Sequence, residues 1–107
     1  MPQVFKRPAA RRDLVAHYVY LAENAGEEVA DRFLLNAQLS FEDLAAQPAM
    51  GATVKVRAPE LDHVRKWRVR EFESVLIFYV PRQSGVSILR VVHAAQDWWQ
   101  LLGLDVP

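Results

Sequence analysis

The sequence predicts an α+β fold in which an antiparallel helix hairpin packs on a small antiparallel sheet, with the order βααβββ and a short C-terminal helix. Two stretches with helical spacing of apolar residues come first, at about residues 9–25 and 27–46. Three strand-like runs follow, at about residues 65–71, 75–80 and 86–93. A chain of 107 residues with 51% hydrophobic and 24% charged residues is typical of one globular domain, residues 1–107.

The N-terminal part predicts a short strand followed by the first helix. The strand, "QVFKR", ends at Pro8, a residue that suits the entrance of a helix. Asn24 and Gly26 in "ENAG" are plausible residues for the end of that helix. The expected apolar stripe of the first helix consists of Leu14, Tyr18, Leu21 and Ala25, with Val15 and Ala22 beside it.

The second helix begins directly after a short link, so the two helices should be antiparallel neighbours. Glu27, Glu28 and Asp31 place negative charge near its N-terminus, where the helix dipole favours it. Its apolar stripe has spacings of three and four and consists of Ala30, Phe33, Ala37, Phe41 and Leu44.

An irregular segment at about residues 52–63 precedes the three strand-like runs. In the first run Trp67 and Val69 share a parity, so their side chains should face the helices, and "PRQSG" carries hairpin-turn residues between the other two runs. The expected short C-terminal helix, at about residues 95–102, contains "DWWQLL". The large side chains expected to be mostly buried are Leu14, Tyr18, Phe33, Phe41, Trp67, Ile77 and Leu89.

Composition excludes several classes of function. The chain has no cysteine, and His17, His63 and His93 show no metal-ligand spacing, so no metal and no cofactor is expected. Neither a signal peptide nor a run long enough to span a membrane is visible, which favours a cytoplasmic protein without a membrane partner.

Cations concentrate in the part that reads as sheet. Residues 55–90 carry eight Lys or Arg and four Asp or Glu, a net of +4 in a chain whose formal net charge is zero. This predicts a local positive field that attracts an anionic partner, although a simple solvated face explains the same pattern. The side chains expected to form such a cationic sheet face are Lys66, Arg68 and Arg70, with Arg82 and Arg90 if they lie nearby.

The order of elements and several motifs resemble the RelE/ParE superfamily of bacterial toxins, which are the toxin halves of type II toxin–antitoxin modules. The likeness covers nearly the whole chain, including "PAARRDLVAHYVYLAENAGEEVADRF" and "ILRVVHAAQDWWQLL". The matching motif residues are Ala10, Asp13 and Leu14; Ala30 and Phe33; Pro48 and Gly51; Arg65, Arg68 and Arg70; Tyr79; and Leu89, Arg90, Val91 and His93.

This resemblance implies a growth-inhibiting toxin of the plasmid-stabilisation type, and two activities remain open. ParE-like members are described as non-enzymatic inhibitors of DNA gyrase, and the "RVVHAAQDW" ending is similar to theirs. RelE-like members are ribosome-dependent, metal-independent endoribonucleases acting on messenger RNA. For such a reaction the candidate cations and proton carriers are Arg68, Arg90, His93 and Tyr79. No Tyr or His follows His93, which favours the ParE-like branch; a toxin fold without toxicity is the third possibility.

The resemblance also implies a cognate antitoxin that wraps the toxin with an extended or helical segment. Such a segment loses entropy when it folds on binding, so it needs both charge pairs and apolar anchors. We expect the cationic sheet face to bind acidic side chains of the antitoxin. Trp98 and Trp99 are the expected apolar anchors, because large aromatic side chains dominate interface energetics.

Overall fold

The computed structural model describes residues 2–54 and 63–96. It has two helices and five strands in these ranges. In chain order they are β1 (Gln3–Lys6), α1 (Pro8–Asn24), α2 (Glu27–Ala46), β2 (Ala52–Thr53), β3 (Arg65–Val69), β4 (Phe72–Arg82) and β5 (Gly85–His93). The predicted C-terminal helix, with Trp98 and Trp99, lies outside the described residues except for Ala95 and Gln96, which form a turn and a bend.

The five strands form one mixed sheet in the order β1-β5-β4-β3-β2. The strands β3, β4 and β5 form the predicted antiparallel meander, and β2 pairs antiparallel with β3. The expectation of an entirely antiparallel sheet is wrong at β1, which pairs parallel with β5 from Gln3↔Gly85 to Lys6↔Ile88. A parallel pair has no connecting turn, so no local signal in the sequence announces it. The two-residue strand β2 lies within the segment that we expected to be irregular.

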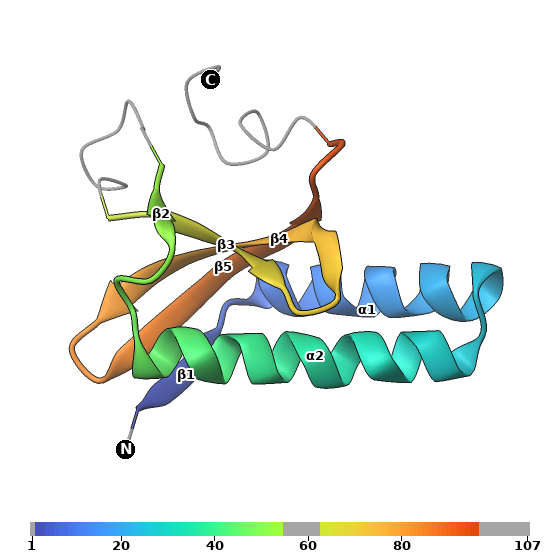
Figure 1. The fold of residues 1–107 in the computed structure, drawn as a ribbon, viewed down its shortest axis with the longest axis horizontal. Helices are drawn as coiled ribbons and strands as arrows, with labels where there is room; N and C mark the ends of the chain where they lie inside the picture. Colours follow the sequence, from blue (N-terminus) through green and yellow to red (C-terminus); the bar gives the residue numbers. More distant parts are fainter. Residues whose placement is uncertain (1, 55–62, 97–107) are drawn as a thin grey trace.

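The helix hairpin covers one face of the sheet, and its connected ends project beyond the sheet (Figure 1). Gly26 links the helices at a φ of 100°, a conformation that side chains other than glycine rarely adopt. Helix α2 buries eight residues along its length, whereas α1 buries only Ala10. The hairpin is therefore held mainly by α2, and much of α1 remains exposed.

The main core lies between the helices and the sheet. Of the seven residues expected to be buried, Phe33, Phe41 and Ile77 are fully so. Leu14 and Trp67 are half-buried against this core. The other two differ. Tyr18 is half-buried and donates a hydrogen bond to Asp31, and Leu89 belongs to a second apolar cluster with Phe78 and Val92. Alternate residues of β4 contribute to the two clusters, so they occupy opposite faces of the sheet.

The inner face of α1 agrees with the predicted stripe at Leu14 and Leu21 and departs from it elsewhere. Ala10 and His17 lie on the inner face with Leu14 and Leu21, and the His17 ring packs 5.5 Å from that of Phe33. Val15, which we expected beside the apolar stripe, is 63% exposed. Hydropathy did not indicate the roles of Asp13 and His17, two polar residues that bind the sheet edge.

Candidate functional site

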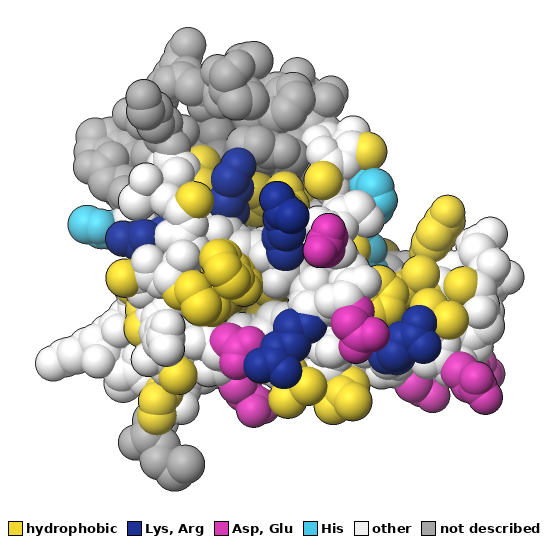
Figure 2. Space-filling model, viewed as in Figure 1, with side chains coloured by type: hydrophobic (Ala, Val, Ile, Leu, Met, Phe, Trp, Pro, Cys, Tyr) yellow, Lys and Arg dark blue, Asp and Glu magenta, His cyan; other side chains and the backbone are white. Residues whose placement is uncertain are grey.

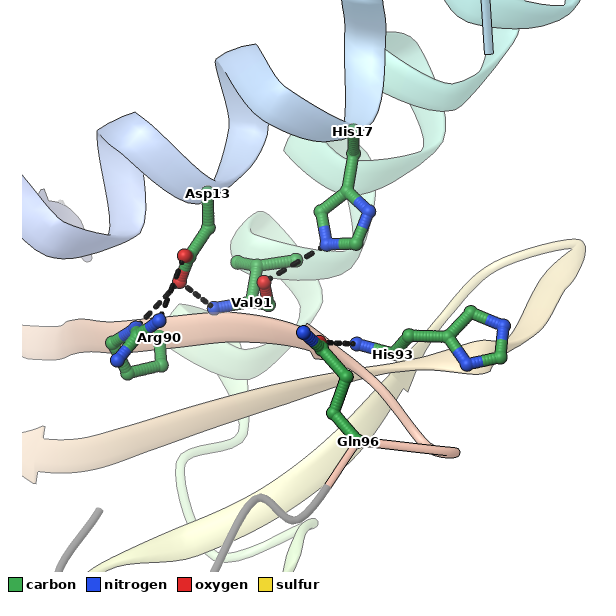
Figure 3. A network of polar contacts seen from close by, with 6 residues as sticks. All are labelled: Asp13, His17, Arg90, Val91, His93 and Gln96. Carbon is green, nitrogen blue, oxygen red and sulfur yellow. Dashed lines mark hydrogen bonds and ion pairs between the residues drawn. The ribbon is translucent and has the colours of Figure 1, made fainter. Parts of the chain in front are cut away.

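Arg90 is held inside the fold rather than presented to a partner. Its guanidinium group donates to both carboxylate oxygens of Asp13 at 2.7 and 3.0 Å, and the hydrogen bond raises the pKa of Arg90 (Figure 3). The same carboxylate accepts a hydrogen bond from the Val91 N–H, and His17 Nε2 lies 3.0 Å from the Val91 carbonyl. A carbonyl only accepts, so Nε2 must carry the proton. Two side chains of α1 thus bind the exposed edge of β5.

Arg70 is also bound within the fold, because it sits in the turn between β3 and β4. Its guanidinium group donates two hydrogen bonds to Asp43 of α2 at 2.9 and 2.8 Å, and its N–H donates to Ser40. The next residue, Glu71, has a φ of 65° and accepts a hydrogen bond from Asn36. The turn is thereby fixed to the helix layer, and Arg70 does not continue the row formed by Lys66 and Arg68.

Arg82 lies at the opposite end of β4, next to the hairpin. It donates to the Ser87 hydroxyl at 2.8 Å and stacks over the Phe5 ring at 5.4 Å from its centroid. The continuous cationic face that we predicted is therefore wrong for Arg70, Arg82 and Arg90. Cations and carboxylates instead alternate over the face seen in Figure 2.

Lys66 and Arg68 do point away from the helices, as predicted. They lie opposite Phe78 and Leu76 of β4, residues of the second apolar cluster. Lys66 is half-buried, and Arg68 is exposed and makes no hydrogen bond or ion pair with another described residue. Arg68 is thus the member of the predicted cationic row whose charge is available to a partner.

A groove of about 570 Å³, here named the β3 groove, lies along the free part of β3. Its apolar lining consists of Met50, Ala52, Trp67, Val69 and Leu76, and its charged lining of Lys66, Arg68, Arg70, Glu71 and Glu73. Strand β2 pairs only with Arg65 and Lys66, so no strand of the described part of the chain continues beside Arg68. Sequence reasoning missed this groove, because it depends on where β2 stops.

Tyr79 is a core residue whose hydroxyl is fully used. The hydroxyl donates to the Pro48 carbonyl at 2.7 Å and accepts from the Gly51 N–H at 2.9 Å, and burial raises the pKa of Tyr79. Arg65 adds hydrogen bonds to the carbonyls of Ala49 and Gly51. These contacts hold the loop between α2 and β2 against the sheet, so Tyr79 is not available as a proton carrier.

The four candidate residues for RNA cleavage are not brought together. Tyr79 is buried and Arg90 is paired with Asp13. His93 lies opposite Val75, a residue of the helix-side core, whereas Arg68 faces the other side of the sheet. His93 accepts a hydrogen bond from the Ala95 N–H through Nδ1, and its ring points away from Asp13 and His17 (Figure 3). This turn contact is the role that a structural histidine would have.

Residues 2–54 and 63–96 contain neither a metal-binding cluster nor a membrane-spanning helix. No three side chains of His, Cys, Asp or Glu are grouped so as to hold a metal ion. Neither described helix has the length and apolar character needed to cross a bilayer.

Comparison with known proteins assigns the family. Residues 4–98 match the sequence model of the ParE toxin of the type II toxin–antitoxin system parDE. The chain belongs to the ParE toxin family. The match begins within β1 and extends past the end of β5, so it includes all the other described elements. No curated protein matches the sequence.

One solved structure supports the ParE fold. It is described as the chromosomal ParDE toxin–antitoxin system from P. aeruginosa, and it is similar to this chain with a TM-score of 0.69 and 19% identity. The alignment covers 87% of this chain and 96% of that one. The RelE/ParE resemblance seen in the sequence is thereby confirmed, and within it the ParE branch.

Proposed function

We propose that this ParE-family toxin is a non-enzymatic inhibitor of DNA gyrase that a cognate antitoxin neutralises in the cytoplasm. The family supports the toxin–antitoxin context. The proposal that the toxin is not an enzyme rests on the contacts and positions of the candidate catalytic side chains. Tyr79 and Arg90 are used in structural contacts, and His93 and Arg68 lie on opposite faces of the sheet. RNA cleavage without a metal needs cations and a proton carrier around one phosphate, which this arrangement does not provide.

The β3 groove is the surface that best fits an antitoxin segment. Its lining combines apolar side chains, among them Trp67 and Met50, with the available guanidinium group of Arg68. A free strand edge allows an extended peptide to add main-chain hydrogen bonds, while neighbouring pockets bind its side chains. The segment expected there is extended, with aliphatic residues and at least one carboxylate that pairs with Arg68. Lys66 lies next to Arg68 in the same lining and adds positive charge.

The activity is tested by inducing expression of the full chain and following plasmid supercoiling and messenger-RNA integrity in the same cultures. Loss of negative supercoiling with intact messenger RNA is expected. Purified gyrase should lose supercoiling activity when the purified chain is added, and the antitoxin should restore it.

The matched variant is His93→Ala, whose side chain is exposed and whose loss should not unfold the protein. We expect this variant to inhibit gyrase like the parent. A general acid or base contributes about 10²–10⁴-fold to rate, so an endonuclease that used His93 would lose its toxicity. Cleavage of messenger RNA before any change in supercoiling, or no effect on either readout, contradicts the proposal.

A further inference from the structure

The outer side of α1 is an apolar surface that no described residue covers. Val15, Val19 and Tyr20 are 63%, 47% and 64% exposed. Val15 and Val19 lie on the side of the helix opposite Ala10, Leu14 and Leu21, which face the core, and Tyr20 lies at the flank of that side. Figure 1 shows that the C-terminal half of α1 projects past the sheet, with α2 as its neighbour. Contiguous exposed apolar surface of this kind is a feature of interaction sites.

Opposite charges stand at the two ends of this surface. Arg12 lies one turn before Val15, and Glu23 lies one turn after Val19. Both residues are exposed, and neither pairs with another described residue. From its N-terminal to its C-terminal end, this face therefore presents a cation, an apolar centre and an anion.

This order is self-complementary under a two-fold rotation. If the axis passes midway between His17 and Tyr18, Arg12 of one copy lies opposite Glu23 of the other. Under the same rotation Val15 lies opposite Tyr20, and Ala16 opposite Val19. A two-fold interface uses the same patch on both subunits, so a cation at one end must meet an anion from the other end. The small side chain of Ala16 near the axis permits close approach of the two helices.

We propose that the outer face of α1 binds the same face of a second copy of this chain, in an antiparallel arrangement. In this arrangement two copies of the α1 face attract each other at both ends, because Arg12 of one copy meets Glu23 of the other.

The interface is small, since it consists of one helix of 17 residues from each copy. Stable interfaces bury a total of about 1,200–2,000 Å², and a single helix pair falls at or below the lower limit. The dimer should therefore be weak, and its population should rise with protein concentration.

Charge reversal tests this arrangement on the purified full chain by sedimentation equilibrium over a concentration series. Arg12→Glu places two glutamates against each other at both ends, and Glu23→Arg does the same with two arginines. Each single variant should weaken association about tenfold or more, because like charges in contact repel. The double variant Arg12→Glu/Glu23→Arg regenerates both pairs and should restore the parent's association. A monomeric parent at all concentrations, or a double variant as weak as the singles, overturns the proposal.

The absence of cysteine allows a second measurement that needs no charge change. The Ala16→Cys variant should form crosslinked dimers with a thiol-reactive linker of about 10 Å, which matches the spacing of packed helices. Leu35→Cys is the matched control on α2 and should stay monomeric. Equal crosslinking of both variants contradicts the proposal.

The antitoxin is the alternative occupant of this face. If Val19→Asp weakens antitoxin binding while the parent chain is monomeric, the face belongs to the antitoxin and the proposal fails. Neither supercoiling nor toxicity enters these measurements, so their failure is distinct from failure of the gyrase proposal.

Discussion

At the scale of single residues, Tyr79 and Gly51 illustrate how closely the loop after α2 is fitted to the sheet. A Cβ atom at Gly51 would lie 2.5 Å from the Tyr79 hydroxyl and 2.7 Å from the Lys66 carbonyl oxygen. No side chain fits there, so glycine is required by contact with its neighbours. This loop supplies Met50 and Ala52 to the lining of the β3 groove. The hydrogen bonds of the Tyr79 hydroxyl to Pro48 and Gly51 therefore help to position part of that lining.

Replacement of Tyr79 by Phe should lower the free energy of unfolding by about 1–3 kcal/mol, because it leaves the Pro48 carbonyl and the Gly51 N–H without their partner. Burial raises the pKa of Tyr79 above its ordinary value of 10.0. The folded state therefore keeps the proton where the unfolded state loses it, and the stability from this group is lost as pH rises above about 10. Urea unfolding at pH 8 and pH 10.5 measures both effects. A parent chain that shows no greater alkaline loss than Tyr79→Phe contradicts this account.

At the scale of elements, side chains of α1 bind backbone groups of β5 that a neighbouring strand would otherwise bind. Beyond Ile88, no described strand pairs with β5 on the β1 side, because β1 ends at Lys6. Asp13 and His17, one helical turn apart, bind the N–H and the carbonyl of Val91 at this edge. This edge is therefore closed to pairing with another chain, whereas no strand within residues 2–54 and 63–96 covers the edge at Arg68.

Loss of the Asp13 carboxylate should be more damaging than loss of the superficially similar Asp43. Asp13→Ala leaves a mostly buried arginine and the Val91 N–H without partners, and should cost about 2–3 kcal/mol. Asp43→Ala breaks an exposed pair and should cost about 0–1 kcal/mol. Urea denaturation of the two variants under identical conditions makes the comparison. Equal losses at the two positions would show that the edge contact is worth no more than a surface ion pair.

The elements also show what the sequence can predict. Helix α2 packs against the sheet along its whole length, so its apolar spacing indicated the buried face correctly from Ala30 to Leu44. The face of α1 was predicted correctly for Leu14 and Leu21. It was not predicted for Asp13 and His17, which bind a strand edge that hydropathy does not reveal. The antiparallel pair of β4 with β5 follows from the hairpin residues of "PRQSG". The pair of β2 with β3 and the parallel pair of β1 with β5 do not follow from any turn visible in the sequence.

At the scale of the whole molecule, cationic and anionic side chains are equal in number, and several of them pair with one another. The chain has 13 Lys or Arg and 13 Asp or Glu, and three of the five cations assigned to the sheet face are bound within the fold. Strand parity predicts correctly that Lys66 and Arg68 point outward. It cannot predict that Arg70 lies in a turn next to α2 and binds Asp43, or that Arg90 pairs with Asp13 of α1. Long-range attraction of an acidic partner is therefore weak, and local pairing decides binding.

The affinity for the antitoxin should accordingly depend on Arg68 more than on overall charge. Arg68→Ala should cost about 2–5 kcal/mol of binding free energy if the guanidinium group is desolvated in the complex, and it should reduce the salt dependence. Arg11→Ala removes an exposed arginine from α1 and should leave affinity unchanged. Calorimetric titration of both variants across a salt series measures these effects. If Arg68→Ala binds like the parent at every salt concentration, Arg68 is merely solvated and the antitoxin binds elsewhere.

The pairing of β1 with β5 has a consequence for synthesis of the toxin. Residues 3–6 find their partners at residues 85–88, so the first strand of the chain waits for nearly the last before it can join the sheet. The helix hairpin, whose contacts are local, can form while translation continues, but its apolar face stays uncovered until the strands arrive. A ribosome that stops before residue 88 therefore releases a product that lacks this strand pair, and the five-stranded sheet cannot be completed until residue 88 has been made.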